Sequence, residues 1–257
     1  MKTLQTQIER IKARGQKAFV PYVMAGDGHL EEQLLYLQQK GATAIEVGIP
    51  FSDPVADGPV IQEAGQRALQ NGANLTRILK ELHTLQATIH IPLVLMTYLN
   101  PIIHYGIEKF VREAEAANVK GLIIPDMPLE EADCIQPFLI ETDIALVQLI
   151  SLTSPLERIN KLAAAAEGFI YAVTVNGTTG SQSQFKSNLH EHFEVLERAA
   201  SIPVLAGFGI STPQQVQEMN QYVDGVIVGS AIVKAFHENN NSHIDELLAA
   251  ASSPIRS

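Results

Sequence analysis

Strand-like and helix-like patterns alternate eight times along the 257 residues of this chain. The connections are short, and no change in composition or low-complexity linker divides the sequence. These observations predict an α/β fold, the (β/α)8 TIM barrel, as a single domain over residues 1–257 with one extra helix at the N-terminus. An open doubly wound sheet is the competing architecture, but no dinucleotide-binding glycine fingerprint follows the first strand.

The first half of the chain carries four strand–helix units after the extra helix. Leu4, Ile8 and Ile11 recur at helical spacing and predict that extra helix over residues 3–14. Pro21 lies within the first predicted strand, where proline removes a ladder hydrogen bond. Asn74 is a candidate N-cap. The other predictions are strands over 18–24, 43–49, 92–96 and 121–125, helices over 29–41, 59–72, 75–85 and 107–118, and a loop over 97–105.

The second half repeats the alternation. Pro137 should bend or shorten the helix predicted over residues 129–142. Asn188 and Glu191 have the spacing of a capping box, which predicts that a helix begins there. Thr212 and Pro213 open another helix. The remaining predictions are strands over 144–150, 168–175, 203–207 and 225–229, and helices over 155–168, 230–237 and 243–251.

Composition excludes several classes of function. The formal net charge of −10 argues against sequence-independent binding to nucleic acid or to anionic membranes. The single cysteine, Cys134, can form no internal disulfide and offers no clustered metal site, so we expect no metal and a reducing, cytoplasmic location. The polar N-terminal stretch does not read as a signal peptide, and no apolar run is long enough to span a bilayer.

Two carboxylates suggest chemistry near the second predicted strand. Glu46 lies among apolar residues of that strand, where burying a carboxylate costs several kcal/mol unless it is paired or used. Three prolines stiffen the following loop, 50–59, which carries Asp53 and Asp57. The pattern suggests paired acid–base catalysis. On spacing alone, a structural ion pair with a solvated acidic turn is an equal alternative.

A phosphate site is predicted after the last two strands. Gly209 follows the seventh strand, directly after Phe208, and Gly229 and Ser230 follow the eighth. Barrels frequently bind phosphate between these loops, where backbone N–H groups and the positive end of a helix dipole meet the anion. Either glycine alone would be read as a turn residue. Neither loop contains lysine or arginine, so the site would depend on dipoles.

The sequence resembles the alpha subunit family of tryptophan synthase. The resemblance rests on IEVGIPFSDPVADGPVIQ around Glu46 and Asp57, which is highly specific, and on four further stretches in the expected order. Together they run through nearly the whole chain. The four stretches are GLIIPDMPLEE (121–131), EGFIYAVTVNGTTG (167–180), VLAGFGIST (204–212) and DGVIVGSAIVK (224–234).

The resemblance implies a lyase of tryptophan biosynthesis that cleaves indole-3-glycerol phosphate into indole and glyceraldehyde 3-phosphate, a retro-aldol reaction. Glu46 would move the protons, and Asp57 would accept a hydrogen bond from the indole ring N–H and stabilise its positive charge. Tyr171 would orient Glu46 or line the pocket. Phe19, Met96 and Ile123 are expected as apolar walls for the indole, although each could equally be an ordinary core residue.

The polar segment 174–187 is a candidate lid over the substrate. The resemblance places Thr179 beside the substrate and Gly180 in the phosphate site. Asn176 and Thr178 differ from the threonine and valine that are more usual in the family.

The resemblance also implies a partner. No cofactor is expected in this chain, and pyridoxal phosphate is expected in a beta subunit that joins it in an α2β2 heterotetramer. Loop 50–59 and Asn100-Pro101 lie on the expected docking face. The alternatives are a stand-alone indole-3-glycerol-phosphate lyase, another phosphate-binding barrel, or a non-catalytic barrel that only activates the beta subunit. The presence of both acids argues against the last two.

Overall fold

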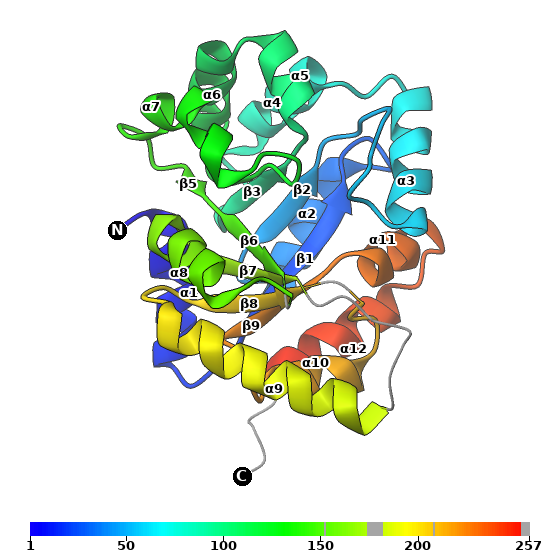
Figure 1. Ribbon diagram of the computed structural model, residues 1–257. Coiled ribbons are helices and arrows are strands. Elements are labelled where there is room, and N and C mark those ends of the chain that lie inside the picture. The colour runs from blue at the N-terminus through cyan, green and yellow to red at the C-terminus, as the bar shows by residue number, and fades with distance from the viewer. Residues whose placement is uncertain (152, 174–181, 208, 253–257) are drawn as a thin grey trace.

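The computed structural model describes residues 1–151, 153–173, 182–207 and 209–252, and a parallel sheet forms its centre (Figure 1). The strand order is β5-β4-β3-β2-β1-β9-β8-β7-β6. The strands at its two ends, β5 (Ala145–Leu146) and β6 (Gln148–Ser151), flank a single residue, Val147. Because these strands are consecutive pieces of one segment, the sheet closes on itself. The predicted (β/α)8 TIM barrel is therefore confirmed.

Helices surround this barrel and cover the outer face of the sheet (Figure 1). The other strands are β1 (Ala18–Met24), β2 (Ile45–Gly48), β3 (Leu93–Met96), β4 (Val119–Ile123), β7 (Ile170–Val173), β8 (Val204–Gly207) and β9 (Gly225–Val228). The helices are α1 (Thr3–Ala13), α2 (Leu30–Gln39), α3 (Pro59–Gln70), α4 (Leu75–Leu85), α5 (Leu99–Tyr105), α6 (Ile107–Ala116), the 3-10 helix η1 (Leu129–Cys134), α7 (Gln136–Leu139), α8 (Leu156–Ala165), α9 (Gln182–Ala199), α10 (Pro213–Met219), α11 (Ser230–His237) and α12 (Asn241–Ser252).

Local signals in the sequence are confirmed at several element boundaries. Asn74 caps α4, since its side chain accepts a hydrogen bond from the Arg77 N–H. Thr212 caps α10 in a capping box. Pro21 lies inside β1 as predicted: the ladder with β9 ends at Pro21 and the ladder with β2 begins at Tyr22. The proline thus lies at the end of one ladder and just before the start of the other, where a missing donor is easiest to accommodate.

Two predictions about strands and loops were wrong. The fifth predicted strand, 144–150, is divided at Val147 because β5 pairs only with β4 and β6 only with β7. The segment 97–105, predicted as a loop, contains the helix α5. Pro101 is compatible with that helix because it lies in the first turn, where backbone N–H groups have no partner within the helix.

Two predictions about helices were also wrong. The single helix predicted over 129–142 is two short pieces, η1 and α7, with a break before Pro137, so the expected bend or shortening at that proline is confirmed. Asn188 does not begin a helix, because α9 already starts at Gln182 and runs through it. No glycine or proline interrupts residues 182–187, so the helix extends into the predicted lid. The rest of that lid, 174–181, lies outside the described residues.

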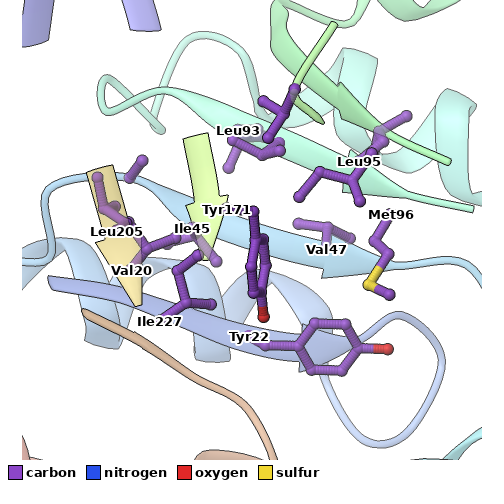
Figure 2. Close-up of a cluster of buried hydrophobic side chains, with 14 of the residues drawn as sticks. Val20, Tyr22, Ile45, Val47, Leu93, Leu95, Met96, Tyr171, Leu205 and Ile227 are labelled. Carbon is purple, nitrogen blue, oxygen red and sulfur yellow. The ribbon is translucent and has the colours of Figure 1, made fainter. Parts of the chain in front are cut away.

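The barrel interior is filled by side chains from most of the strands. Figure 2 shows such a cluster, in which Val20, Leu205 and Ile227 lie with Tyr171 and Tyr22. All seven residues of β1 are buried, as in a parallel sheet that is covered on both faces. The core therefore supports the inward-facing residues at the carboxyl ends of the strands.

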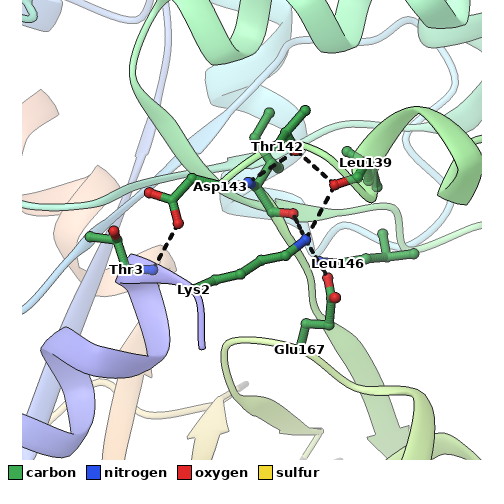
Figure 3. A network of polar contacts seen from close by, with 8 residues as sticks. Lys2, Thr3, Leu139, Thr142, Asp143, Leu146 and Glu167 are labelled. Carbon is green, nitrogen blue, oxygen red and sulfur yellow. Dashed lines mark hydrogen bonds and ion pairs between the residues drawn. The ribbon is translucent and has the colours of Figure 1, made fainter.

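Helix α1 packs beside the N-terminal ends of β4 and β7. A Cβ atom on Gly121 or Gly168 would come within 3 Å of the Leu4 side chain, so α1 packs directly on these glycines. Figure 3 shows how polar contacts fix the start of this helix. The Lys2 Nζ donates to the Ile144 carbonyl at 2.6 Å and pairs with Glu167 at 2.9 Å. The extra N-terminal helix of the prediction is thus an integral part of the barrel.

Candidate active site

A cavity of about 300 Å³ opens at the carboxyl ends of the strands. Barrel enzymes keep their active sites at this end. Both predicted carboxylates and both predicted glycine loops contribute to its wall. The lining residues are Tyr22, Glu46, Asp57, Gly58, Ile61, Met96, Tyr171, Gly209, Ile210, Ser211, Ile227, Gly229 and Ser230.

Glu46 faces the cavity from the middle of the barrel wall. It lies on β2 between its register partners Tyr22 and Val94, and its residue is only 1% exposed. Within the described part of the chain, its carboxyl group makes no hydrogen bond or ion pair. Burial, followed by the charge of Asp57, raises the pKa of Glu46 to about 8. The group is therefore protonated at neutral pH, poised to give a proton and later to take one.

Asp57 faces the same cavity from the loop between β2 and α3. The Tyr98 hydroxyl donates to its Oδ2 at 3.1 Å and accepts from the Ala56 N–H at 2.9 Å, so one phenol positions both the carboxylate and its loop. Gln62 Nε2 donates to the Asp57 carbonyl at 2.8 Å. Burial raises the pKa of Asp57, and the Tyr98 hydrogen bond opposes that rise. The environment thus favours a neutral Glu46 beside a more readily ionised Asp57.

Two phenols flank Glu46, and each occupies the space beside a glycine. A Cβ atom on Gly48 would collide with the Tyr22 hydroxyl, and one on Gly207 would collide with the Tyr171 ring. Figure 2 shows the Tyr171 hydroxyl directed toward the base of the Tyr22 side chain, whose own hydroxyl points away from Tyr171. Burial raises the pKa of both phenols well above the usual value, and the charges of Glu46 and Asp57 raise it further. Both side chains are therefore protonated at any physiological pH.

The opposite end of the cavity is built from backbone. Gly209 has a φ of +74°, a conformation that favours glycine, and it starts the loop that continues through Ser211. Gly229 and Ser230 lie at the N-terminus of α11. The side chain of Gln215 holds the first loop, since its Oε1 accepts from the Ser211 N–H at 2.8 Å. The positive end of the α11 dipole and the backbone N–H groups near it form a site suited to an anion.

The structure brings together most, but not all, of the predicted site residues. Seven line the cavity: Glu46, Asp57, Met96, Tyr171, Gly209, Gly229 and Ser230. Phe19 and Ile123 are buried, and neither is among the residues that line this cavity. Phe19 is three positions from Tyr22 and so lies on the opposite face of β1. Ile123 packs beside Met96, its register partner. Thr179, Gly180 and Phe208 lie outside the described residues.

Sequence reasoning missed several residues of this site. The most consequential are Tyr22, which lines the cavity beside Glu46, and Tyr98, which holds Asp57. Tyr22 pairs with Glu46 in the sheet, so both side chains face the barrel interior. This signal is absent from the sequence until the pairing of the strands is known. Tyr98 directly precedes α5 and donates to Asp57 across 41 residues of sequence, a contact that no local pattern marks.

The described residues also bear on metal binding and on membrane insertion. No group of three or more His, Cys, Asp or Glu side chains among them is arranged to hold a metal ion. In the same ranges, none of the helices has the length and apolar character needed to cross a membrane. Cys134 is a free, partly buried thiol on η1, away from the residues that line the cavity.

Comparison with known proteins shows similarity to one family over nearly the whole chain. A family profile described as "Tryptophan synthase alpha chain" matches residues 8–254. A protein of that name from Bacillus anthracis is 48% identical over 249 residues, covering 95% of this chain and 96% of the relative. One from Listeria welshimeri is 50% identical over 251 residues, covering 96% and 97%.

Solved structures show the same fold. Tryptophan synthase from Mycobacterium tuberculosis superposes with a TM-score of 0.88 at 29% identity, and the match covers 100% of both chains. Tryptophan synthase subunit alpha from Legionella pneumophila superposes with a TM-score of 0.87 at 32% identity, covering 99% of this chain and 98% of the other. The barrel and its extra helix are thus shared with these proteins over nearly their whole length.

Proposed function

This chain belongs to the tryptophan synthase alpha chain family, and from that premise we propose that Glu46 and Asp57 divide the acid–base work of its reaction. The enzyme is a lyase of tryptophan biosynthesis that cleaves indole-3-glycerol phosphate into indole and glyceraldehyde 3-phosphate. The chemistry must protonate indole C3, stabilise the resulting cation, and deprotonate a glycerol hydroxyl as the C–C bond breaks. Two carboxylates with different protonation states suit these needs.

Glu46 is the group that moves the protons. Its pKa of about 8 means that it arrives protonated and can donate to C3 of the indole ring. The carboxylate that results then takes the proton from the glycerol hydroxyl next to the breaking bond. The electrons of that bond return to the ring and restore the indole, a carbonyl forms on the three-carbon fragment, and Glu46 regains its starting state.

Asp57 stabilises the cation between these two steps. It accepts a hydrogen bond from the ring N–H while the Tyr98 hydroxyl donates to its Oδ2. The phosphate binds at the far end, on the backbone of Gly209, Gly229 and Ser230 at the start of α11. Gly180 and Phe208 complete this phosphate site and Thr179 contacts the substrate, as the family resemblance implies. Tyr171 and Met96 form the walls between the two ends.

The observation that carries this assignment is Glu46 itself, a carboxyl group that is 1% exposed, lines a cavity and makes no hydrogen bond in the described part of the chain. A purely structural carboxyl group would be paired. The test is indole release by Glu46→Gln and Asp57→Asn, with Asp53→Asn as the control. Asp53 lies on the same loop, is exposed and does not line the cavity. Near-normal turnover by Glu46→Gln would refute the assignment.

A beta subunit is the partner that the family implies, and we propose an α2β2 heterotetramer in which only the beta subunit holds pyridoxal phosphate. This chain would need no cofactor and would work in the cytoplasm. The proposed docking face is loop 50–59 together with α5, at the same end of the barrel as the cavity. Val55 and Ile103 are 83% and 56% exposed there and offer apolar contacts.

Light scattering on mixed subunits tests the heterotetramer, and coupled assays test activation. Val55→Asp and Ile103→Asp should weaken association, whereas Leu156→Asp, an exposed apolar residue on α8, should not. Absence of association at high micromolar concentration would favour the stand-alone lyase instead.

A further inference from the structure

Tyr22 is the cavity residue whose role the proposed mechanism leaves open. Its side chain starts near the phosphate end, where a Cβ atom on Gly229 would lie 3.8 Å from the Tyr22 Cβ. Its hydroxyl lies over Gly48, at the carboxyl end of β2. Asp57 is the first of the charges that act on this phenol. The ring therefore runs along the cavity, with its hydroxyl at the end where Asp57 meets the indole.

The hydroxyl group of Tyr22 is poorly satisfied. Tyr22 is 5% exposed, and within the described residues its one hydrogen-bond contact is the Met24 sulfur at 3.9 Å. A thioether is a weak acceptor. A buried donor that lacks a good partner is destabilising, and phenylalanine would fill the same space without that penalty. The donor therefore points to a ligand that supplies an acceptor.

We propose that Tyr22 is a specificity-determining residue whose hydroxyl gives the indole part of the cavity a hydrogen-bond donor. The enzyme then favours substrates whose benzo ring carries an acceptor, such as a hydroxyl group, over those with a methyl group of similar size at the same position. This inference rests on the proposed placement of the indole near Asp57. Its physical basis is that a site with a fixed buried donor discriminates against an isostere that leaves the donor unpaired.

The test uses indole-3-glycerol phosphates with a hydroxyl or a methyl group at each of the four benzo-ring positions. For each pair, kcat/KM is measured with the native enzyme and with Tyr22→Phe, which removes only the hydroxyl. For each pair, the preference is the ratio of kcat/KM for the hydroxyl substrate to kcat/KM for the methyl substrate. At one of the four positions this ratio should be about five times higher in the native enzyme than in Tyr22→Phe. The change should appear mainly in KM, because the contact exists before the bond breaks.

Tyr36→Phe is the matched control, because it removes a phenol hydroxyl that bonds Asp245 on the outer surface. Its preference should equal that of the native enzyme. A hydroxyl-to-methyl preference that is the same in native and Tyr22→Phe enzymes at all four positions would overturn the proposal.

A binding measurement separates this inference from the acid–base assignment. Unreactive analogues, in which a propyl phosphate chain replaces the glycerol phosphate, are titrated calorimetrically into both enzymes. The ratio of Kd for the methyl analogue to Kd for the hydroxyl analogue should again be about five times higher in the native enzyme than in Tyr22→Phe. This result does not depend on the proposed catalytic roles of Glu46 and Asp57. Equal ratios would again refute the role of Tyr22, and thermal unfolding of Tyr22→Phe confirms that the comparison is between folded proteins.

Discussion

Replacing Glu46 by glutamine should abolish indole release and also stabilise the protein at alkaline pH. Glutamine keeps the size of the side chain but cannot ionise or transfer the proton. The stability effect follows from burial, which raises the pKa of Glu46 from 4.5 to about 8. A change of that size corresponds to about 5 kcal/mol of differential stability between the two protonation states.

The sign of the effect depends on pH. Below pH 4.5 the carboxyl group is protonated in both the folded and the unfolded protein, and its contribution to stability is fully present. Between pH 4.5 and about 8 the unfolded chain ionises while the folded protein keeps the proton, so stability falls as pH rises. Above pH 8 the loss levels off. Between pH 6 and pH 9, Glu46 should therefore reduce the free energy of unfolding by about 3 kcal/mol.

Urea unfolding of native protein and Glu46→Gln at pH 6, 7.5 and 9 measures this effect. Other titrating groups are common to both proteins, so the difference between their unfolding free energies isolates Glu46. That difference should move in favour of the variant as pH rises, and Asp53→Asn should show no such trend. A difference that stays constant across the range would refute the raised pKa, and with it the reason for assigning Glu46 as the proton donor at neutral pH.

Three further variants test the rest of the site. Asp57→Asn should lower kcat by about two to three orders of magnitude with the fold intact, because it removes charge stabilisation but not proton transfer; steady-state kinetics measures this. Tyr98→Phe removes the hydrogen bond that lowers the pKa of Asp57, so the acidic limb of the kcat profile should shift to higher pH. Gly207→Ala should push the Tyr171 ring into the cavity, which should raise KM and lower the free energy of unfolding in urea by about 1–3 kcal/mol. Gly65→Ala is the control, because Gly65 on α3 has room for a methyl group, and it should show neither effect.

The elements that sequence predicts correctly are those with local causes. Asn74 and Thr212 cap helices through their own side chains, and no distant contact is needed. The division at Val147 has a different origin, because β5 and β6 join different neighbours in the sheet. The residues 144–150 form one apolar run, and nothing in that run marks where pairing changes. The helix α5 was not predicted because Asn100-Pro101 is equally compatible with a β-turn and with the first turn of a helix.

The site shows the same division between local and non-local information. Glu46 was found because a carboxylate among apolar residues is unusual in any strand, and the glycine loops were found because they follow the last two strands. Deciding whether Phe19 or Tyr22 faces the cavity requires the strand register. Every residue of β1 is buried, so burial alone does not separate the inner from the outer face of the sheet. The register does separate them: Tyr22 pairs with Glu46, and Gly48, two residues after Glu46, leaves room for the phenol.

Gly207 and Tyr171 repeat this arrangement across β8 and β7. Glycine on one strand beside tyrosine on the next therefore sets the width of the cavity on both sides of Glu46, the proposed catalytic group. A methyl group at either glycine should alter substrate binding before it alters proton transfer.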